Sequence, residues 1–122
     1  MAKKSTIVVA TNNPGKLKEF AMLLPDFQII SQTSLDITPE EEVGETFFEN
    51  SLQKARVANN ASGMAALGDD SGLIVPVLNN LPGLRSARYA HENATDDENR
   101  LYLKTELEKL NLTEAKAYFV CV

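Results

Sequence analysis

The stretch Met64-Ala65-Ala66-Leu67-Gly68-Asp69-Asp70-Ser71-Gly72-Leu73-Ile74-Val75 sets a short polar turn between two apolar runs. Two adjacent carboxylates are costly to hold together unless a cation neutralises them. The glycines on either side, Gly68 and Gly72, let the backbone turn sharply and let a ligand come close. We therefore interpret the segment as a metal-and-water site between two strands. The alternative, an Asx-turn at a hairpin, explains one aspartate more easily than two.

Strands and helices alternate along the rest of the chain. Apolar, β-branched runs predict further strands at 6–10, 27–30 and 117–122. Apolar residues at helical spacing, with their start and stop residues, predict three helices: one between Gly15 and Pro25, one from Thr46 to about Ser62, and one from Thr95 past Leu107. This alternation predicts a three-layer α/β fold, with residues 1–122 forming a single domain.

Local signals mark where several elements begin and end. Thr46 and Glu49 have the spacing of a capping box at a helix start, and Gly63 is expected to end that helix. Leu81-Pro82-Gly83 predicts a turn, and residues 86–93 are expected to be irregular.

Composition excludes several classes of protein. The 122 residues are 43% hydrophobic, which is enough for one core, and the net charge of −5 argues against nonspecific binding to DNA, RNA or an anionic membrane. The single Cys121 rules out an internal disulfide, which fits a reducing cytoplasm. No apolar run is long enough to span a bilayer.

The last apolar run stops at Val122 without a turn or a polar tail. We expect either that the polypeptide is truncated or that a partner covers the exposed strand edge.

Two segments carry groups suited to phosphate. Thr11-Asn12-Asn13-Pro14-Gly15-Lys16 joins a strand to a helix, where free N–H groups and a partial positive charge favour anions. The loop lacks the Walker A pattern, and its alternative interpretation is a helix cap beside a solvated lysine. Asn50 and Lys54 lie four residues apart on one helix face, where they could bind phosphate oxygens or form a solvent-exposed polar face.

The remaining chemical groups point to a metal rather than to a nucleophile. Glu40-Glu41-Glu42 is either a solvated loop or the source of one Mg²⁺ ligand, with Asp70 as another. Ser71 has no credible catalytic histidine, because the single His91 lies in a polar stretch, so we reject a Ser-His-Asp site. Arg88-Tyr89 either stacks on a base and neutralises phosphate or packs as an ordinary aromatic beside a surface arginine.

Taken together, four segments resemble the Ham1-like inosine triphosphate pyrophosphatases, which remove non-canonical purine nucleotides. They follow one another in the order found in that family: Thr11 to Lys16; Gly44-Glu45-Thr46-Phe47-Phe48-Glu49-Asn50-Ser51 with Lys54-Ala55; Asp69-Asp70-Ser71-Gly72-Leu73; and Leu81-Pro82-Gly83-Leu84-Arg85-Ser86-Ala87-Arg88-Tyr89. Each motif is weak alone, but four in register are specific.

The resemblance implies a mixed-sheet fold of the inosine triphosphatase type and hydrolysis of ITP, dITP or XTP to the monophosphate and pyrophosphate. It implies Mg²⁺ as cofactor, held by Asp70 and by Glu41 or its neighbour Glu42, with Asp70 also orienting or deprotonating the attacking water. A homodimer and a purine nucleoside triphosphate are the implied partners, and neither nucleic acid nor membrane is expected. The resemblance implies these substrate-binding residues: Thr11, Asn12, Asn13, Pro14, Gly15, Lys16, Lys54 and Ser71.

The chain also departs from the family pattern. Family members are longer and carry C-terminal segments resembling Phe-Gly-Tyr-Asp-Pro and Ser-His-Arg that help to recognise the purine base, and neither occurs here. We therefore expect a C-terminally truncated domain with the phosphate and metal half of the site. Two alternatives stay open: an inactive chain that binds phosphate or a partner through its open strand edge, and a different small α/β phosphatase that releases orthophosphate.

Overall fold

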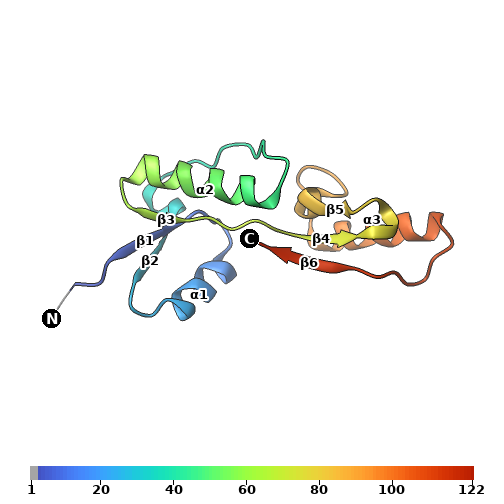
Figure 1. The fold of residues 1–122 in the computed structure, drawn as a ribbon, viewed down its shortest axis with the longest axis horizontal. Helices are drawn as coiled ribbons and strands as arrows, with labels where there is room; N and C mark the ends of the chain where they lie inside the picture. The colour runs from blue at the N-terminus through green and yellow to red at the C-terminus, as the bar shows by residue number, and fades with distance from the viewer. Residues whose placement is uncertain (1–2) are drawn as a thin grey trace. The chain divides into compact units, whose positions relative to one another are not determined.

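The computed structural model describes residues 3–122, and the chain divides into two compact units. The N-terminal unit ends at Asp70, and the C-terminal unit runs from Ser71 to Val122. Figure 1 labels the elements of both units, which are described in turn.

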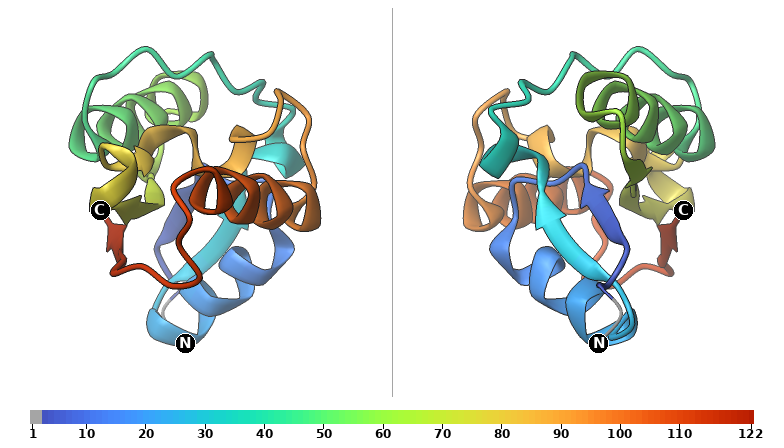
Figure 2. Two further views of the ribbon diagram at one scale, coloured as in Figure 1. Left: turned by 90° about the vertical axis from the view of Figure 1, so that its right-hand side faces the viewer. Right: turned by 90° about the vertical axis from the view of Figure 1, so that its left-hand side faces the viewer.

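The N-terminal unit is a parallel sheet with helices on its faces. Its elements are β1 (Thr6–Val9), α1 (Pro14–Leu23), β2 (Gln28–Ser31), the 3₁₀ helix η1 (Gln32–Leu35), α2 (Phe47–Ser62) and β3 (Ala65–Leu67). The strand order is β2-β1-β3, and Val8 of the central strand lies opposite Ile30 on one side and Ala66 on the other. The right-hand view of Figure 2 shows β1 and β2 side by side, and Figure 1 shows α1 and α2 on opposite faces of the sheet.

The core of this unit lies between the sheet and α2. Val8, Val9 and Ala58 are fully buried, as expected for a central parallel strand with a continuous apolar sequence. Gly68 lets the chain after β3 pass close to α2, because a Cβ there would lie 2.4 Å from the Ser51 carbonyl oxygen. The backbone of α2 therefore fixes the position of Gly68, the residue just before the aspartate pair.

The C-terminal unit is built on an antiparallel sheet. Its elements are β4 (Ser71–Val75), the 3₁₀ helices η2 (Pro76–Leu78) and η3 (Gly83–Arg88), β5 (Leu81–Pro82), α3 (Asp96–Lys109) and β6 (Tyr118–Cys121). The strand order is β5-β4-β6, and Ile74 lies opposite both Pro82 and Tyr118. Ile74, Val75 and Leu78 are buried, whereas Phe119 on β6 keeps 69% of its surface exposed.

The predicted α/β class with strands of mixed direction is confirmed, but one alternative interpretation and two local predictions are wrong. The alternative interpretation of the aspartate pair as a hairpin turn is wrong, because β3 and β4 belong to different sheets. Leu81–Pro82 pairs with β4 as a short strand instead of forming a turn, and η3 extends into the stretch expected to be irregular. The polar loop after β2 contains η1. The strand Leu81–Pro82 is set by tertiary pairing rather than by local periodicity, so its short sequence does not reveal it.

The predicted end of α2 at Gly63 is confirmed, whereas its predicted capping box forms only in part. Thr46 caps α2 by accepting the Glu49 N–H, and Gly63 ends the helix at φ +69°. Glu49 does not complete the capping box, because its carboxylate accepts the N–H of Glu45 instead. The box is complete at α3, where Thr95 and Glu98 make both bonds. Within residues 3–122 no helix has the length and apolar character needed to cross a membrane.

Candidate functional site

The aspartate pair follows β3 directly and is buried. Asp69 and Asp70 retain only 8% and 6% of their surface exposure. The end of β3 is held against β1 by a 2.9 Å hydrogen bond from the Ala10 N–H to the Leu67 carbonyl oxygen. Burying two carboxylates side by side is costly unless cations pair with them. A lysine from each helix of the N-terminal unit does so.

Lys16 pairs with the first aspartate. Its Nζ lies 2.7 Å from Oδ2 of Asp69, whose side chain is 10% exposed. The lysine sits in the first turn of α1, where the Asn13 side chain caps the helix by accepting the N–H groups of Gly15 and Lys16. The loop after β1 therefore presents a fixed ammonium group at a helix N-terminus.

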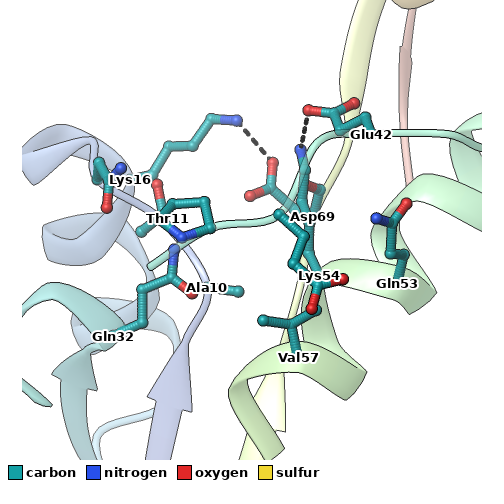
Figure 3. A pocket seen from close by; sticks show the side chains of 12 residues that line it. Ala10, Thr11, Lys16, Gln32, Glu42, Gln53, Lys54, Val57 and Asp69 are labelled. Atoms are coloured by element: carbon teal, nitrogen blue, oxygen red, sulfur yellow. Dashed lines mark hydrogen bonds and ion pairs between the residues drawn. The ribbon is translucent and has the colours of Figure 1, made fainter. Parts of the chain in front are cut away.

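Lys54 joins the second aspartate to the acidic loop, residues 40–45 before α2. Its ammonium lies 3.3 Å from Oδ1 of Asp70, 3.1 Å from Oε1 of Glu42 and 3.1 Å from the backbone carbonyl oxygen of Asp69. An ammonium group has three donors, so these contacts use all of them. Figure 3 shows Lys54 reaching from α2 to Glu42, and Lys16 directed at Asp69.

Two carboxylate oxygens of this cluster have no hydrogen-bond partner within the part of the chain that the structure describes. They are Oε2 of Glu42 and Oδ2 of Asp70, and both are buried. With Asp69, three carboxylates face the two ammonium groups, which leaves a net negative charge in the cluster. Buried, unpartnered anionic oxygens on two separate segments suit a hard cation.

The two carboxylates, Glu42 and Asp70, suit Mg²⁺ better than they suit a metal whose ligands all come from protein side chains. Among residues 3–122 no group of three or more His, Cys, Asp or Glu side chains could hold a metal ion. Mg²⁺ is commonly bound through one or two carboxylates, with waters and substrate phosphates completing its shell. Glu42 and Asp70 offer that number of carboxylates.

The cluster borders a pocket of about 210 Å³ within the N-terminal unit. Polar side chains from α1, η1, the acidic loop, α2 and the segments after β1 and β3 line it: Thr11, Asn12, Lys16, Gln32, Glu40, Glu42, Gln53, Lys54 and Asp69. Figure 3 labels most of them, including Lys16, Lys54 and Asp69. Both lysines thus face a space in which an anionic ligand could lie.

The structure brings several of the predicted site residues together at this pocket. Thr11, Asn12, Lys16 and Lys54 line it, whereas Asn13, Pro14 and Gly15 shape the adjoining helix start. Asn12 accepts a 2.7 Å hydrogen bond from the Thr33 hydroxyl, and the Thr11 hydroxyl oxygen accepts the Asn13 N–H.

Three other predicted residues are not among those that line this pocket: Glu41, Asn50 and Ser71. The Glu41 side chain is exposed, and its neighbour Glu42 is the acidic residue that reaches Lys54. Ser71 begins β4 in the C-terminal unit, opposite Cys121. Asn50 is 1% exposed and accepts the Gly44 N–H at 2.8 Å, so neither the expected phosphate contact nor the solvent-exposed face describes it.

Sequence reasoning overlooked the parts played by Asp69 and Gln53. Asp69 was noted as one of two carboxylates but received no partner, because nothing in the sequence joins it to Lys16. Gln53 donates to the Glu41 carbonyl oxygen of the acidic loop, and its place beside Lys54 in the sequence was the available signal.

In the C-terminal unit Tyr89, a candidate for stacking on a base, packs within its own unit. The Tyr89 ring meets Tyr102 edge to face, with centroids 4.7 Å apart. Burial, followed by the nearby Glu106 carboxylate, raises the pKa of Tyr89. His91 is exposed and contacts Glu98.

Comparison with known proteins supplies the family. The sequence model described as "Ham1 family" matches residues 7–122. The dITP/XTP pyrophosphatase of Haemophilus influenzae is 50% identical over 119 residues, which cover 96% of this chain and 61% of that protein. The dITP/XTP pyrophosphatase of Photorhabdus laumondii is 47% identical, covering 95% and 60% respectively.

Solved structures agree with the sequence comparison. A HAM1 protein from Coxiella burnetii superposes with a TM-score of 0.88 at 42% identity, covering 97% of this chain and 61% of that one. The Ham1 protein of Staphylococcus aureus gives a TM-score of 0.84 at 41% identity, covering 96% and 60%. The chain therefore spans about three-fifths of the length of the relatives it matches.

Proposed function

The chain belongs to the Ham1 family, and from that premise we propose that it hydrolyses non-canonical purine nucleoside triphosphates such as dITP, XTP and ITP. The products are the nucleoside monophosphate and pyrophosphate. The observation that carries the proposal is the buried cluster of Lys16, Lys54, Asp69, Asp70 and Glu42, which has two unpartnered carboxylate oxygens beside a pocket. The names of its relatives, dITP/XTP pyrophosphatases, support the substrate class.

In this proposal the two lysines bind the triphosphate. Phosphoryl-transfer enzymes act mainly by positioning their substrates and neutralising charge, so a fixed cation on each of two helices is the main requirement. Lys16 has 37% of its side chain exposed, so it can meet phosphate oxygens while Asp69 still limits its motion. Lys54 contacts two carboxylates and a backbone carbonyl oxygen, which use all three of its donors, so it must give up one contact to meet a phosphate.

We assign the cofactor site to Glu42 and Asp70, whose free oxygens Oε2 and Oδ2 would hold Mg²⁺. When bound, Mg²⁺ neutralises charge that develops on the phosphate oxygens. The structure favours Glu42 over Glu41 for this part, because the Glu41 side chain is exposed. Asp70 also orients the attacking water and accepts its proton.

The remaining assignments follow the family resemblance. Thr11, Asn12 and Asn13, with the backbone of Pro14 and Gly15, surround the phosphates near Lys16, and Ser71 touches substrate. We propose a cytoplasmic homodimer, consistent with one free cysteine and with the exposed apolar residues of β6, Tyr118 and Phe119.

The experiment is incubation of the chain with dITP and Mg²⁺, with pyrophosphate and orthophosphate measured separately. Pyrophosphate release that stops on addition of EDTA supports the proposal. Orthophosphate as the product indicates a different phosphatase. A chain that circular dichroism shows to be folded but that releases neither product contradicts the proposed activity and favours the non-catalytic alternative.

A further inference from the structure

The acidic loop that carries Glu42 has no regular secondary structure, and α2 supplies its hydrogen bonds. Residues 40–45 are neither helix nor strand. Three side chains of α2 bind their backbone: Glu49 accepts the Glu45 N–H at 2.8 Å, Asn50 accepts the Gly44 N–H at 2.8 Å, and Gln53 makes two further bonds. The loop thus lies against a helix whose side chains replace the partner strand that a β-ladder would supply.

Gln53 binds the backbone on both sides of Glu42. Its Nε2 donates to the Glu41 carbonyl oxygen at 2.7 Å, and its Oε1 accepts the Val43 N–H at 3.2 Å. A primary amide that donates and accepts in this way fixes the two peptide groups between which Glu42 sits. Their orientation decides where the Glu42 side chain points.

That orientation separates Glu42 from the other acidic residues of the run. Glu40 and Glu41 are exposed, whereas Glu42 is half-buried with Oε1 3.1 Å from Lys54 and Oε2 without a partner. Gln53 and Lys54 are consecutive residues of α2, so one turn of helix holds both the backbone around Glu42 and its carboxylate. Figure 3 shows the three side chains together.

We infer that Gln53 is a positioning residue that sets the affinity of this chain for a divalent cation, by holding the Glu42 carboxylate at the Asp70 side of the site. The inference rests on the proposed function, because it takes Glu42 and Asp70 as the metal-binding pair. Residues that orient metal ligands through hydrogen bonds typically change metal affinity by about 10- to 100-fold when they are replaced.

The test is Mn²⁺ binding, measured by the loss of the free-ion signal in electron paramagnetic resonance, without any substrate. Gln53→Met keeps an unbranched side chain of similar length and good helix propensity but removes both hydrogen bonds. We expect it to weaken Mn²⁺ binding about 10-fold. Gln53→Ala should weaken binding at least as much, and circular dichroism checks that both variants fold.

The matched control is Asn59→Ala on the same helix. Asn59 also donates from a side-chain amide to a backbone carbonyl, that of Met64 at 2.8 Å, but away from the acidic loop. This variant should bind Mn²⁺ as the unaltered chain does. A double-mutant cycle then tests the route: in a Glu42→Gln background, Gln53→Met should cause no further loss of affinity, because Gln53 acts through Glu42.

Three results would overturn the inference. They are unchanged Mn²⁺ affinity in Gln53→Met, an equal loss in Asn59→Ala, or independent, additive losses in the cycle with Glu42→Gln. Absence of Mn²⁺ binding by the unaltered chain overturns it as well. A chain that binds Mn²⁺ but releases no pyrophosphate from dITP contradicts the proposed function alone, so the two failures are distinguishable.

Discussion

Both the N-terminal unit and the C-terminal unit contain close pairs of acidic and basic side chains, but they hold them differently. In the N-terminal unit Lys54 joins Glu42 to Asp70, whose side chain is 8% exposed. In the C-terminal unit the pairs are on the surface, as in Arg100 with Asp97, whose side chain is 89% exposed. The first arrangement brings charges from separate segments together, whereas the second connects residues that are close in the sequence, such as Asp97 and Arg100 three apart on α3.

The difference in burial distinguishes the candidate site of the N-terminal unit from the solvated surface of the C-terminal unit. An exposed ion pair contributes about 0–1 kcal/mol, because water screens it. A buried charge is costly unless it is paired. Removing one partner of a buried pair therefore destabilises the fold, because the other charge is left without compensation. The acidic run Glu40-Glu41-Glu42 and the run Asp96-Asp97-Glu98 look alike in the sequence, yet we expect function to depend on the first. The following predictions compare the two units.

The largest expected effect is on turnover. Asp70→Asn removes the carboxylate that we assign to the water and the cation, and we expect dITP hydrolysis to fall by about 10²- to 10⁴-fold. Asp97→Asn, the matched change on the surface of α3, should leave the rate unchanged. Steady-state pyrophosphate release from both variants is the measurement, and equal rates would refute the assignment of Asp70.

The next effect concerns backbone packing at two glycines. Gly68→Ala places a Cβ 2.4 Å from the Ser51 carbonyl oxygen and 2.7 Å from the Ala55 nitrogen, both backbone atoms of α2. We expect a loss of about 3 kcal/mol in the free energy of unfolding. Gly83→Ala, in the C-terminal unit, has φ +54° but no heavy atom closer than 3.9 Å, so about 1 kcal/mol is expected. Urea titration measures the free energy of unfolding of both variants. A larger loss in Gly83→Ala than in Gly68→Ala would contradict the prediction.

A smaller effect is expected from removing a lysine. Lys54→Met leaves Glu42 and Asp70 facing each other without their shared cation, and we expect it to cost about 2 kcal/mol of stability. Lys104→Met removes an exposed lysine that lies 3.9 Å from Glu108, and its effect should stay within about 0.5 kcal/mol. Thermal unfolding of the two variants side by side measures the difference, and equal losses would show that Lys54 is no more than a surface lysine.

The smallest effect is a pH dependence in the C-terminal unit. The hydrogen bond from His91, followed by the Thr95 backbone N–H, holds the pKa of Glu98 below its ordinary value of 4.5. Because folding lowers this pKa, the stabilisation from the ionised carboxylate is complete above about pH 4.5 and is lost as pH falls through the folded-state value.

Glu98→Gln tests this pH dependence, because glutamine keeps the capping bond to Thr95 but loses the charge. The midpoint of thermal unfolding should be slightly lower in the variant at about pH 6, and this difference should vanish in acid. A difference that stays constant with pH would argue against the ionised carboxylate as its source.

The sequence predicted the elements with strong periodicity and the family to which the chain belongs. Thr6–Val9 forms the central strand because its continuous apolar sequence suits burial on both faces, and Gly63 ends α2 as its position indicated. Which strands would pair on either side of the aspartate pair could not be predicted, because strand pairing depends on tertiary contacts. β3 finds its partner in β1, which lies 55 or more residues earlier in the chain.

The site was predictable in its residue types but not in its contacts. Lys16, Lys54 and Asp70 were identified from their motifs, and the structure brings them into one unit. The choice among the three acidic residues of the loop could not be made from the sequence, because it depends on how Gln53 holds the backbone at Glu41 and Val43. The Lys16–Asp69 pair could not be predicted from the sequence either, because it joins residues 53 positions apart.

The most direct test of the account is to locate a divalent cation on the folded chain. Mn²⁺ broadens the nuclear magnetic resonance signals of amides near the position where it binds. We predict that, on titration with Mn²⁺, broadening is strongest at Glu42, Lys54 and Asp70 and is lost in Asp70→Asn. Strongest broadening at Asp96, Asp97 and Glu98 would contradict the claim that the buried charges of the N-terminal unit form the functional site.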